Sequence, residues 1–164
     1  MNTVCLIDTS VFLNLLNVPN CNDDKEEVCK SFMEYTALDC TFILPMATIL
    51  ETGNHIAKNG DGGTRRKSAK RFCDSVKAAF NGEAPWKPSE FPKSREVMNW
   101  IDSFPDLAGQ NKSVTKTGEG TSFADLSIIQ DYKKCIKKFS MAEIFIWSLD
   151  SDLKFYQYRP QPRP

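Results

Sequence analysis

Four acidic residues stand where folding could bring their side chains to one site. Asp8 follows the apolar run TVCLI, and Asp150 follows IFIWSL, so each is the first charged residue after an expected strand. Glu51 lies about two turns into an expected helix, and Asp125 lies near the start of another. Carboxylates held close together repel each other, and a bound divalent cation relieves that repulsion. The four acids therefore predict a cation site.

The expected cation is Mg²⁺ or Mn²⁺, because oxygen ligands suit these hard ions. The six cysteines form no CxxC pair and His55 is the only histidine, which disfavours zinc. Such ions activate water and stabilise the charge that develops on a phosphodiester. His55 lies one turn after Glu51, and we expect a structural or solvent-facing role for it, with a metal or phosphate contact as the alternative.

Composition indicates one globular domain without a broad affinity for polyanions. The chain has 164 residues, 41% of them hydrophobic, and a formal net charge of zero. Contact with nucleic acid would need a local basic patch, and the dense run that offers one comprises Arg65, Arg66, Lys67, Lys70 and Arg71. The alternative is a solvated helix face. No signal peptide or membrane span is recognisable, so we expect a cytoplasmic protein with reduced cysteines.

Strands and helices are expected to alternate along the chain. The apolar runs predict strands over 3–8, 41–44 and 143–149, and the periodic segments predict helices over 11–17, 24–38, 46–58, 64–80, 94–104 and 122–139. Thr9 or Ser10 is the expected cap of the first helix, and Thr64 that of the helix over 64–80. We expect an irregular loop over 81–93, a mobile segment over 109–120, and a short strand or turn over 153–158.

Apolar strands that alternate with helices predict a three-layer α/β/α fold with a mostly parallel central sheet. Ligands of such sheets bind beyond the carboxyl ends of the strands, where strand order reverses. Asp8 and Asp150 would lie at that edge, and Glu51 and Asp125 could reach the same cleft from their helices.

Four short motifs resemble those of PIN-domain ribonucleases: IDTS, LET, GTSFAD and SLDSDLKF, in the family's order. The resemblance implies Asp8, Glu51, Asp125 and Asp150 as catalytic metal ligands, with Asp152 as a further acid of the last motif. It also implies supporting roles for Ser10 and Thr121, and a parallel sheet of about five strands. It places one PIN-like domain over 1–158. The sequence departs from the compact toxin pattern in a longer helical insertion around 59–120, and the proline-rich residues 159–164 are expected to form a flexible tail.

The function implied by the resemblance is a Mg²⁺- or Mn²⁺-dependent endoribonuclease. Its candidate role is the toxin of a toxin–antitoxin pair, with RNA as substrate and an antitoxin protein and a second copy of the chain as candidate partners. The alternative is a non-catalytic PIN-like module that binds RNA or regulates. A haloacid-dehalogenase-like phosphatase is disfavoured, because Ser10 stands where that chemistry needs a second aspartate.

Overall fold

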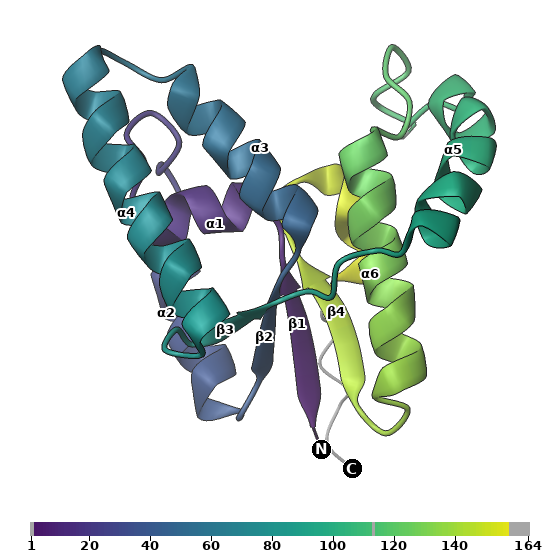
Figure 1. Cartoon of the computed structure of the whole chain (residues 1–164), viewed down its shortest axis with the longest axis horizontal. Helices are drawn as coiled ribbons and strands as arrows, with labels where there is room; N and C mark the ends of the chain where they lie inside the picture. The colour runs from purple at the N-terminus through teal and green to yellow at the C-terminus, as the bar shows by residue number, and fades with distance from the viewer. Residues whose placement is uncertain (1, 113, 158–164) are drawn as a thin grey trace.

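The computed structural model describes residues 2–112 and 114–157. Within them, four parallel strands form the central sheet in the order β3-β2-β1-β4 (Figure 1). Their bounds are β1 Thr3–Ile7, β2 Thr41–Leu44, β3 Trp86–Pro88 and β4 Glu143–Trp147. Cys5 at the centre of β1 pairs with Phe42 on one side and with Phe145 on the other.

Helices cover both faces of this sheet, which confirms the predicted three-layer α/β/α fold with a parallel centre. The helices are α1 Thr9–Leu15, α2 Lys25–Ala37, α3 Met46–Ala57, α4 Gly62–Asn81, α5 Ser94–Gly109 and α6 Phe123–Lys138, followed by the 3₁₀ helix η1 Ser151–Tyr156. The core on one face is built with α1, α2 and α4, and the core on the other with α6 and η1. Helix α5 packs against α6.

Successive strand residues alternate between these two cores. Cys5 and Ile7 of β1 belong to the larger core, while Leu6 between them belongs to the core beneath α6. In β4, Trp147 likewise faces the larger core and Ile146 the other. Because both faces are buried, the strands read as continuous apolar runs instead of alternating with polar residues.

The strand order reverses between β1 and β4. From β1 the chain proceeds to β2 and β3 on one side, and then crosses to β4 on the other side of β1. The ends of β1 and β4 stay paired, since the backbone N–H of Asp8 donates to the carbonyl of Trp147 at 3.0 Å. Sheets of this kind bind ligands beyond the carboxyl ends of the strands at such a reversal, so this edge is where a binding site is expected.

The loop expected over 81–93 contains β3, so that prediction is wrong at its centre. Trp86–Pro88 pairs with Phe42–Leu44, more than 40 residues earlier in the chain. Prolines flank and end this strand, and proline is tolerated there because β3 is an edge strand that need not donate on its outer side. Local propensity therefore hid a strand that long-range pairing stabilises.

Two expected helix caps are also corrected. Asp8 caps α1 itself, accepting from the backbone N–H of Ser10 at 3.4 Å, so neither Thr9 nor Ser10 is the cap. Asp61 caps α4 and accepts from the N–H groups of Gly63 and Thr64, so Thr64 is inside the helix. In both places an aspartate lies just before the expected cap, and its carboxylate reaches the free N–H groups of the first turn.

Two further expected elements differ from the structure, and a third lies outside the residues that it describes. Helix α5 continues past Phe104 and through Pro105 to Gly109, at the cost of one backbone hydrogen bond. The strand considered for 153–158 is the 3₁₀ helix η1, which leaves four strands in the described residues where the resemblance implies about five. The tail over 159–164 lies outside the described residues.

Among the helices of the described segments, none combines the length and the apolar character needed to cross a membrane.

Candidate active site

Four acidic side chains from four parts of the chain line one cavity of about 360 Å³. Asp8 follows β1, Glu51 is on α3, Asp125 is on α6, and Asp150 follows β4. The cavity lies between α3 and α6, beyond the carboxyl ends of the strands (Figure 1). Its other lining residues are Thr9, Ser10, Leu13, His55, Lys112, Ser122 and Leu153.

Asp8 is buried and held by two serine hydroxyls. The Oγ atoms of Ser10 and Ser148 each donate to Asp8 Oδ2 at 2.7 Å. Ser148 Oγ also accepts from the backbone N–H of Asp150 at 3.0 Å, so one hydroxyl links the acids that follow β1 and β4. These contacts all use Oδ2, which leaves Oδ1 of Asp8 without a hydrogen bond in the described part of the chain.

Glu51 is half-buried in α3 and accepts from Thr9 Oγ1 at 2.9 Å. The pKa of its carboxyl is raised, first because burial disfavours the charged form. The hydrogen bond from Thr9 opposes that rise, and the negative charges of Asp125 and Asp8 add to it. The charges of Asp125 and Asp8 thus act on the pKa of Glu51 in the same direction as burial, as expected for acids that share one site.

The remaining acids are paired with two lysines of the segment that joins α5 to α6. Lys112 Nζ lies 2.9 Å from Asp125 Oδ2 and 3.2 Å from Asp152 Oδ2. Lys116 Nζ lies 2.8 Å from the same Asp152 oxygen and 3.0 Å from Asp150 Oδ1. Burial acts to raise the pKa of Asp152, but the two ammonium groups outweigh it and hold that pKa below its usual value.

Two residues of the acidic motifs, Asp152 and Thr121, lie outside the cavity lining. Asp152 stands behind it, with a side chain only 3% exposed, and reaches the other acids through the lysines. Thr121 donates its backbone N–H to the carbonyl of Leu107 at 3.3 Å. The neighbouring Ser122 lines the cavity instead, and its Oγ caps α6 by accepting from the N–H of Asp125 at 3.0 Å.

The basic run forms the first turns of α4 and does not reach the cavity lining. Arg65, Arg66, Lys67 and Lys70 are exposed. Arg71 is engaged elsewhere, because its guanidinium donates to the carbonyls of Leu16 at 3.1 Å and Asn17 at 3.0 Å, at the end of α1. Arg71 is therefore tied to the end of α1, whereas the guanidinium of Arg65 donates to the carbonyl of Gly60, just before its own helix.

Sequence reasoning missed four residues that hold the acids: Thr9, Ser148, Lys112 and Lys116. Thr9 lies inside the motif IDTS, and Ser148 opens SLDSD, so their motifs pointed to them. The lysines gave no such signal, because they stand in a polar segment whose position against the acids depends on the fold. His55 lines the cavity from an exposed position on α3, and its charge lowers the pKa of Glu51 slightly.

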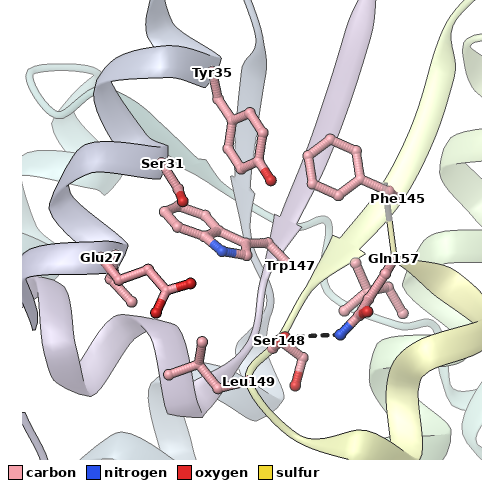
Figure 2. A pocket seen from close by; sticks show the side chains of 10 residues that line it. Glu27, Ser31, Tyr35, Phe145, Trp147, Ser148, Leu149 and Gln157 are labelled. Atoms are coloured by element: carbon pink, nitrogen blue, oxygen red, sulfur yellow. Dashed lines mark hydrogen bonds between the residues drawn. The ribbon is translucent and has the colours of Figure 1, made fainter. Parts of the chain in front are cut away.

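A second cavity of about 340 Å³ lies between α2, the end of β4 and Gln157, and Ser148 is part of its lining (Figure 2). Tyr35 and Trp147 meet edge to face in its wall, with ring centroids 5.1 Å apart. Gln157 closes one side by donating to the carbonyl of Ser148 at 3.1 Å. Among the described residues Glu27 is the one acid in its lining, so the acids gather in the first cavity and not here.

A divalent ion fits the acidic cavity by ligand chemistry but not by the present arrangement. The donors are carboxylate oxygens, and Oδ1 of Asp152 is buried without a hydrogen bond. Yet no three acidic, histidine or cysteine side chains of the described residues are placed to hold a metal ion. The lysine ammonium groups lie against the oxygens of Asp125, Asp150 and Asp152 that such an ion would use.

The chain matches no protein-family model, and neither the curated proteins nor the solved structures include a significant match to it. The acidic cavity is therefore interpreted from its own geometry and chemistry.

Proposed function

We propose that this protein is a Mg²⁺- or Mn²⁺-dependent endoribonuclease. The observation that supports the proposal most is the convergence of Asp8, Glu51, Asp125 and Asp150 on one cavity at the point where strand order reverses. Acids from separate elements meet there at an electrostatic cost: burial raises the pKa of Glu51, and the negative charges of Asp125 and Asp8 add to that rise. A cation site explains why the acids are close together, because the folded protein without a cation would be more stable if these carboxylates lay apart.

Hydroxyl groups of the chain would orient the acids toward a bound cation. Ser10 and Ser148 hold one oxygen of Asp8, and Thr9 holds one oxygen of Glu51, so the second oxygen of each carboxylate is left for a ligand. A bound divalent ion would supply activated water and stabilise the negative charge on the phosphate. No serine or cysteine beside a histidine base is needed for this chemistry.

A cleavage assay tests the proposal directly. A fluorescent single-stranded RNA pool is incubated with the protein in Mg²⁺, in Mn²⁺ and in EDTA, alongside the variants Asp8→Asn and Glu51→Gln. We expect cleavage only with a divalent ion and a loss of at least about 100-fold in each variant. Asp74→Asn, an exposed acid on α4, is the matched control and should cleave normally. Full activity in both site variants would overturn the proposal.

A second candidate function is a PIN-like module that binds RNA without cleaving it. It is favoured by the lysine pairing of Asp125, Asp150 and Asp152, which neutralises three acids without a metal. Fluorescence anisotropy separates the two functions. Capture of RNA that stays intact in Mn²⁺, and is unaffected by Asp8→Asn, would favour the module over the enzyme.

The toxin role belongs to the same proposal and has its own test. Induced expression of the intact chain in a bacterial host should arrest growth, and Asp8→Asn should relieve the arrest. The antitoxin would then be the protein whose co-expression restores growth with the intact chain. Size-exclusion chromatography with light scattering tests the proposed homodimer.

A further inference from the structure

The segment between α5 and α6 sets two ammonium groups against the acids of the candidate site. Lys112 bridges Asp125 and Asp152, and Lys116 bridges Asp150 and Asp152. Both lysines meet on one atom, Asp152 Oδ2, at 3.2 and 2.8 Å. In Figure 1 this segment forms the loop above α6, on the side of the molecule where the cavity lies.

Asp152 explains why cations belong at this position. Its side chain is 3% exposed, and its Oδ1 atom makes no hydrogen bond within the described residues. A carboxylate that is removed from water and incompletely hydrogen-bonded is costly unless a positive charge compensates it. The two lysines now provide that charge, and the buried Oδ1 provides a ligand atom that they leave unused.

The loop is anchored at its base and exposed at its tip. A Cβ atom on Gly120 would collide with the carbonyl oxygen of Ala108, so only glycine allows this close approach to the end of α5. Across the loop, the N–H of Lys112 donates to the carbonyl of Glu119 at 2.7 Å. Val114 is 97% exposed, so its side chain gives the tip no apolar anchor to the domain.

We propose that Lys112 and Lys116 form a latch that competes with a divalent cation for Asp125, Asp150 and Asp152. In the latched state the lysines neutralise the acids, and binding of the cation displaces the ammonium groups and frees the loop. The inference rests on the proposed metal site and adds its regulation. It accounts for a set of acids that has the ligands of a metal site but not the arrangement of one.

The exchange is physically reasonable because one pair of the latch, Lys116 with Asp150, is weak. Lys116 and Asp150 have side chains that are 37% and 40% exposed, and ion pairs in such positions contribute little because water and salt screen them. A divalent cation carries two charges on one centre and can coordinate several carboxylate oxygens at once. The tip of the loop can move away from the acids while the contact of Gly120 with Ala108 keeps the base of the loop in place.

Lysine acylation tests the displacement in the unmodified protein. The protein is treated briefly with an acetylating reagent with and without Mg²⁺, and each lysine is quantified by mass spectrometry. We expect the reactivity of Lys112 and Lys116 to rise severalfold with Mg²⁺, because a paired ammonium group is a poor nucleophile. Lys67 and Lys70 on the exposed face of α4 are internal standards and should not change.

Metal affinity provides a second and independent measurement. The variant Lys112→Gln/Lys116→Gln should bind Mn²⁺ about tenfold more tightly than the unmodified protein, since no closed state has to be opened first. Lys134→Gln/Lys138→Gln removes the same charge from pairs with Glu96 and Glu90, away from the cavity, and is the matched control. Titration calorimetry, or the electron paramagnetic resonance signal of free Mn²⁺, gives the Kd.

The outcomes separate the latch from the metal site. Binding of Mn²⁺ to the lysine variant alone, or binding to both proteins with the expected rise in reactivity, supports the latch. Binding to both with equal affinity and unchanged lysine reactivity overturns the latch and leaves the proposed metal site standing. A failure of every protein to bind Mn²⁺ or Mg²⁺ overturns the metal site and the latch with it. If the lysine variant fails to fold, the acylation experiment still decides.

Discussion

Each acid at the cavity is held through one carboxylate oxygen. Asp8 uses Oδ2 for both serines, Glu51 uses Oε2 for Thr9, and Asp152 uses Oδ2 for both lysines. The partners fix the direction of each side chain without occupying both oxygens. Such supporting contacts decide the orientation of ligands in metal sites, so the hydroxyl groups define the candidate site together with the acids.

The raised pKa of Glu51 predicts a pH-dependent gain in stability for Glu51→Gln. A carboxyl whose pKa is higher in the folded protein stabilises the fold below its ordinary pKa, and loses that contribution as pH rises through the raised value. In the metal-free protein, Glu51→Gln should therefore raise the Tm at pH 7 and leave it unchanged near pH 3.5. Because Glu51 is half-exposed, we expect less than about 1 kcal/mol, or up to about 3 °C.

Scanning calorimetry of both proteins from pH 3.5 to 8 measures this difference. A Tm difference that does not grow with pH, or that grows in the opposite direction, would contradict the electrostatic explanation of the site. Asp74→Asn serves again as the control, because this exposed acid is far from the cavity lining.

Ser148→Ala should weaken the site without touching a carboxylate. The substitution removes the donor to Asp8 Oδ2 and the acceptor for the N–H of Asp150. Loss of such a contact usually lowers metal affinity or activity by about 10- to 100-fold. Ser31→Ala, in the second cavity across β4, is the matched control. Equal Mn²⁺ affinity and equal RNA cleavage in the two variants would argue against a positioning role for Ser148.

At the scale of elements, α3 is the helix whose placement matters most, since it carries Glu51. Thr48 Oγ1 donates to the carbonyl of Ile7 at the end of β1, at 2.7 Å. At the start of α3, the N–H of Met46 donates to Ser89 Oγ at 3.2 Å, and α3 also packs against α6. These contacts tie α3 to β1, to the end of β3 and to α6.

Two threonines one turn apart on α3 should respond oppositely to the same substitution. Both are fully buried, but Thr52 Oγ1 makes no hydrogen bond within the described residues, whereas Thr48 Oγ1 does. Thr48→Val should destabilise the protein by about 1–3 kcal/mol, because it leaves the carbonyl of Ile7 unpaired. Thr52→Val should be neutral or stabilising. Urea denaturation measures both, and a larger loss for Thr52→Val would contradict the assigned contacts.

The whole molecule carries no net charge, so attraction of RNA would have to be local. The first turns of α4 present exposed cations, and in Figure 1 this helix begins beyond the carboxyl ends of the strands, the side on which the cavity opens. Arg71 is excluded from this surface because it binds the end of α1. The cations that remain are Arg65, Arg66, Lys67 and Lys70.

Arg66→Ala/Lys67→Ala should lower the affinity for RNA, and should also make that affinity less sensitive to salt concentration. Each lost phosphate contact lowers the slope of log K against log salt by about 0.7 for single strands, so two lost contacts lower it by roughly 1.4. Lys25→Ala/Lys30→Ala on α2 is the control with equal loss of charge. An unchanged slope in the α4 variant, measured by anisotropy from low to moderate salt, would assign this basic surface to solubility alone.

Much of the architecture follows from local sequence pattern. The apolar runs at β1, β2 and β4, and the helical spacing of Val28, Phe32 and Tyr35 on α2, are local signals that burial on the sheet then satisfies. Asp8 and Asp150 could be assigned to one edge, because parallel strands present their carboxyl ends together. The local pattern failed at β3, where three residues pair with a distant strand.

The positions of the acids and the main strands of the sheet could thus be predicted from local sequence pattern. The residues that contact those acids could not be predicted in this way. Ser148 meets Asp8 across 140 positions, and Lys116 meets Asp152 across 36, so these contacts depend on the relative positions of whole elements. Hydrogen bonds and ion pairs act over a few ångströms, a distance that only packing determines. Sequence alone therefore pointed to the carboxylates, and tertiary structure decided what holds and neutralises them.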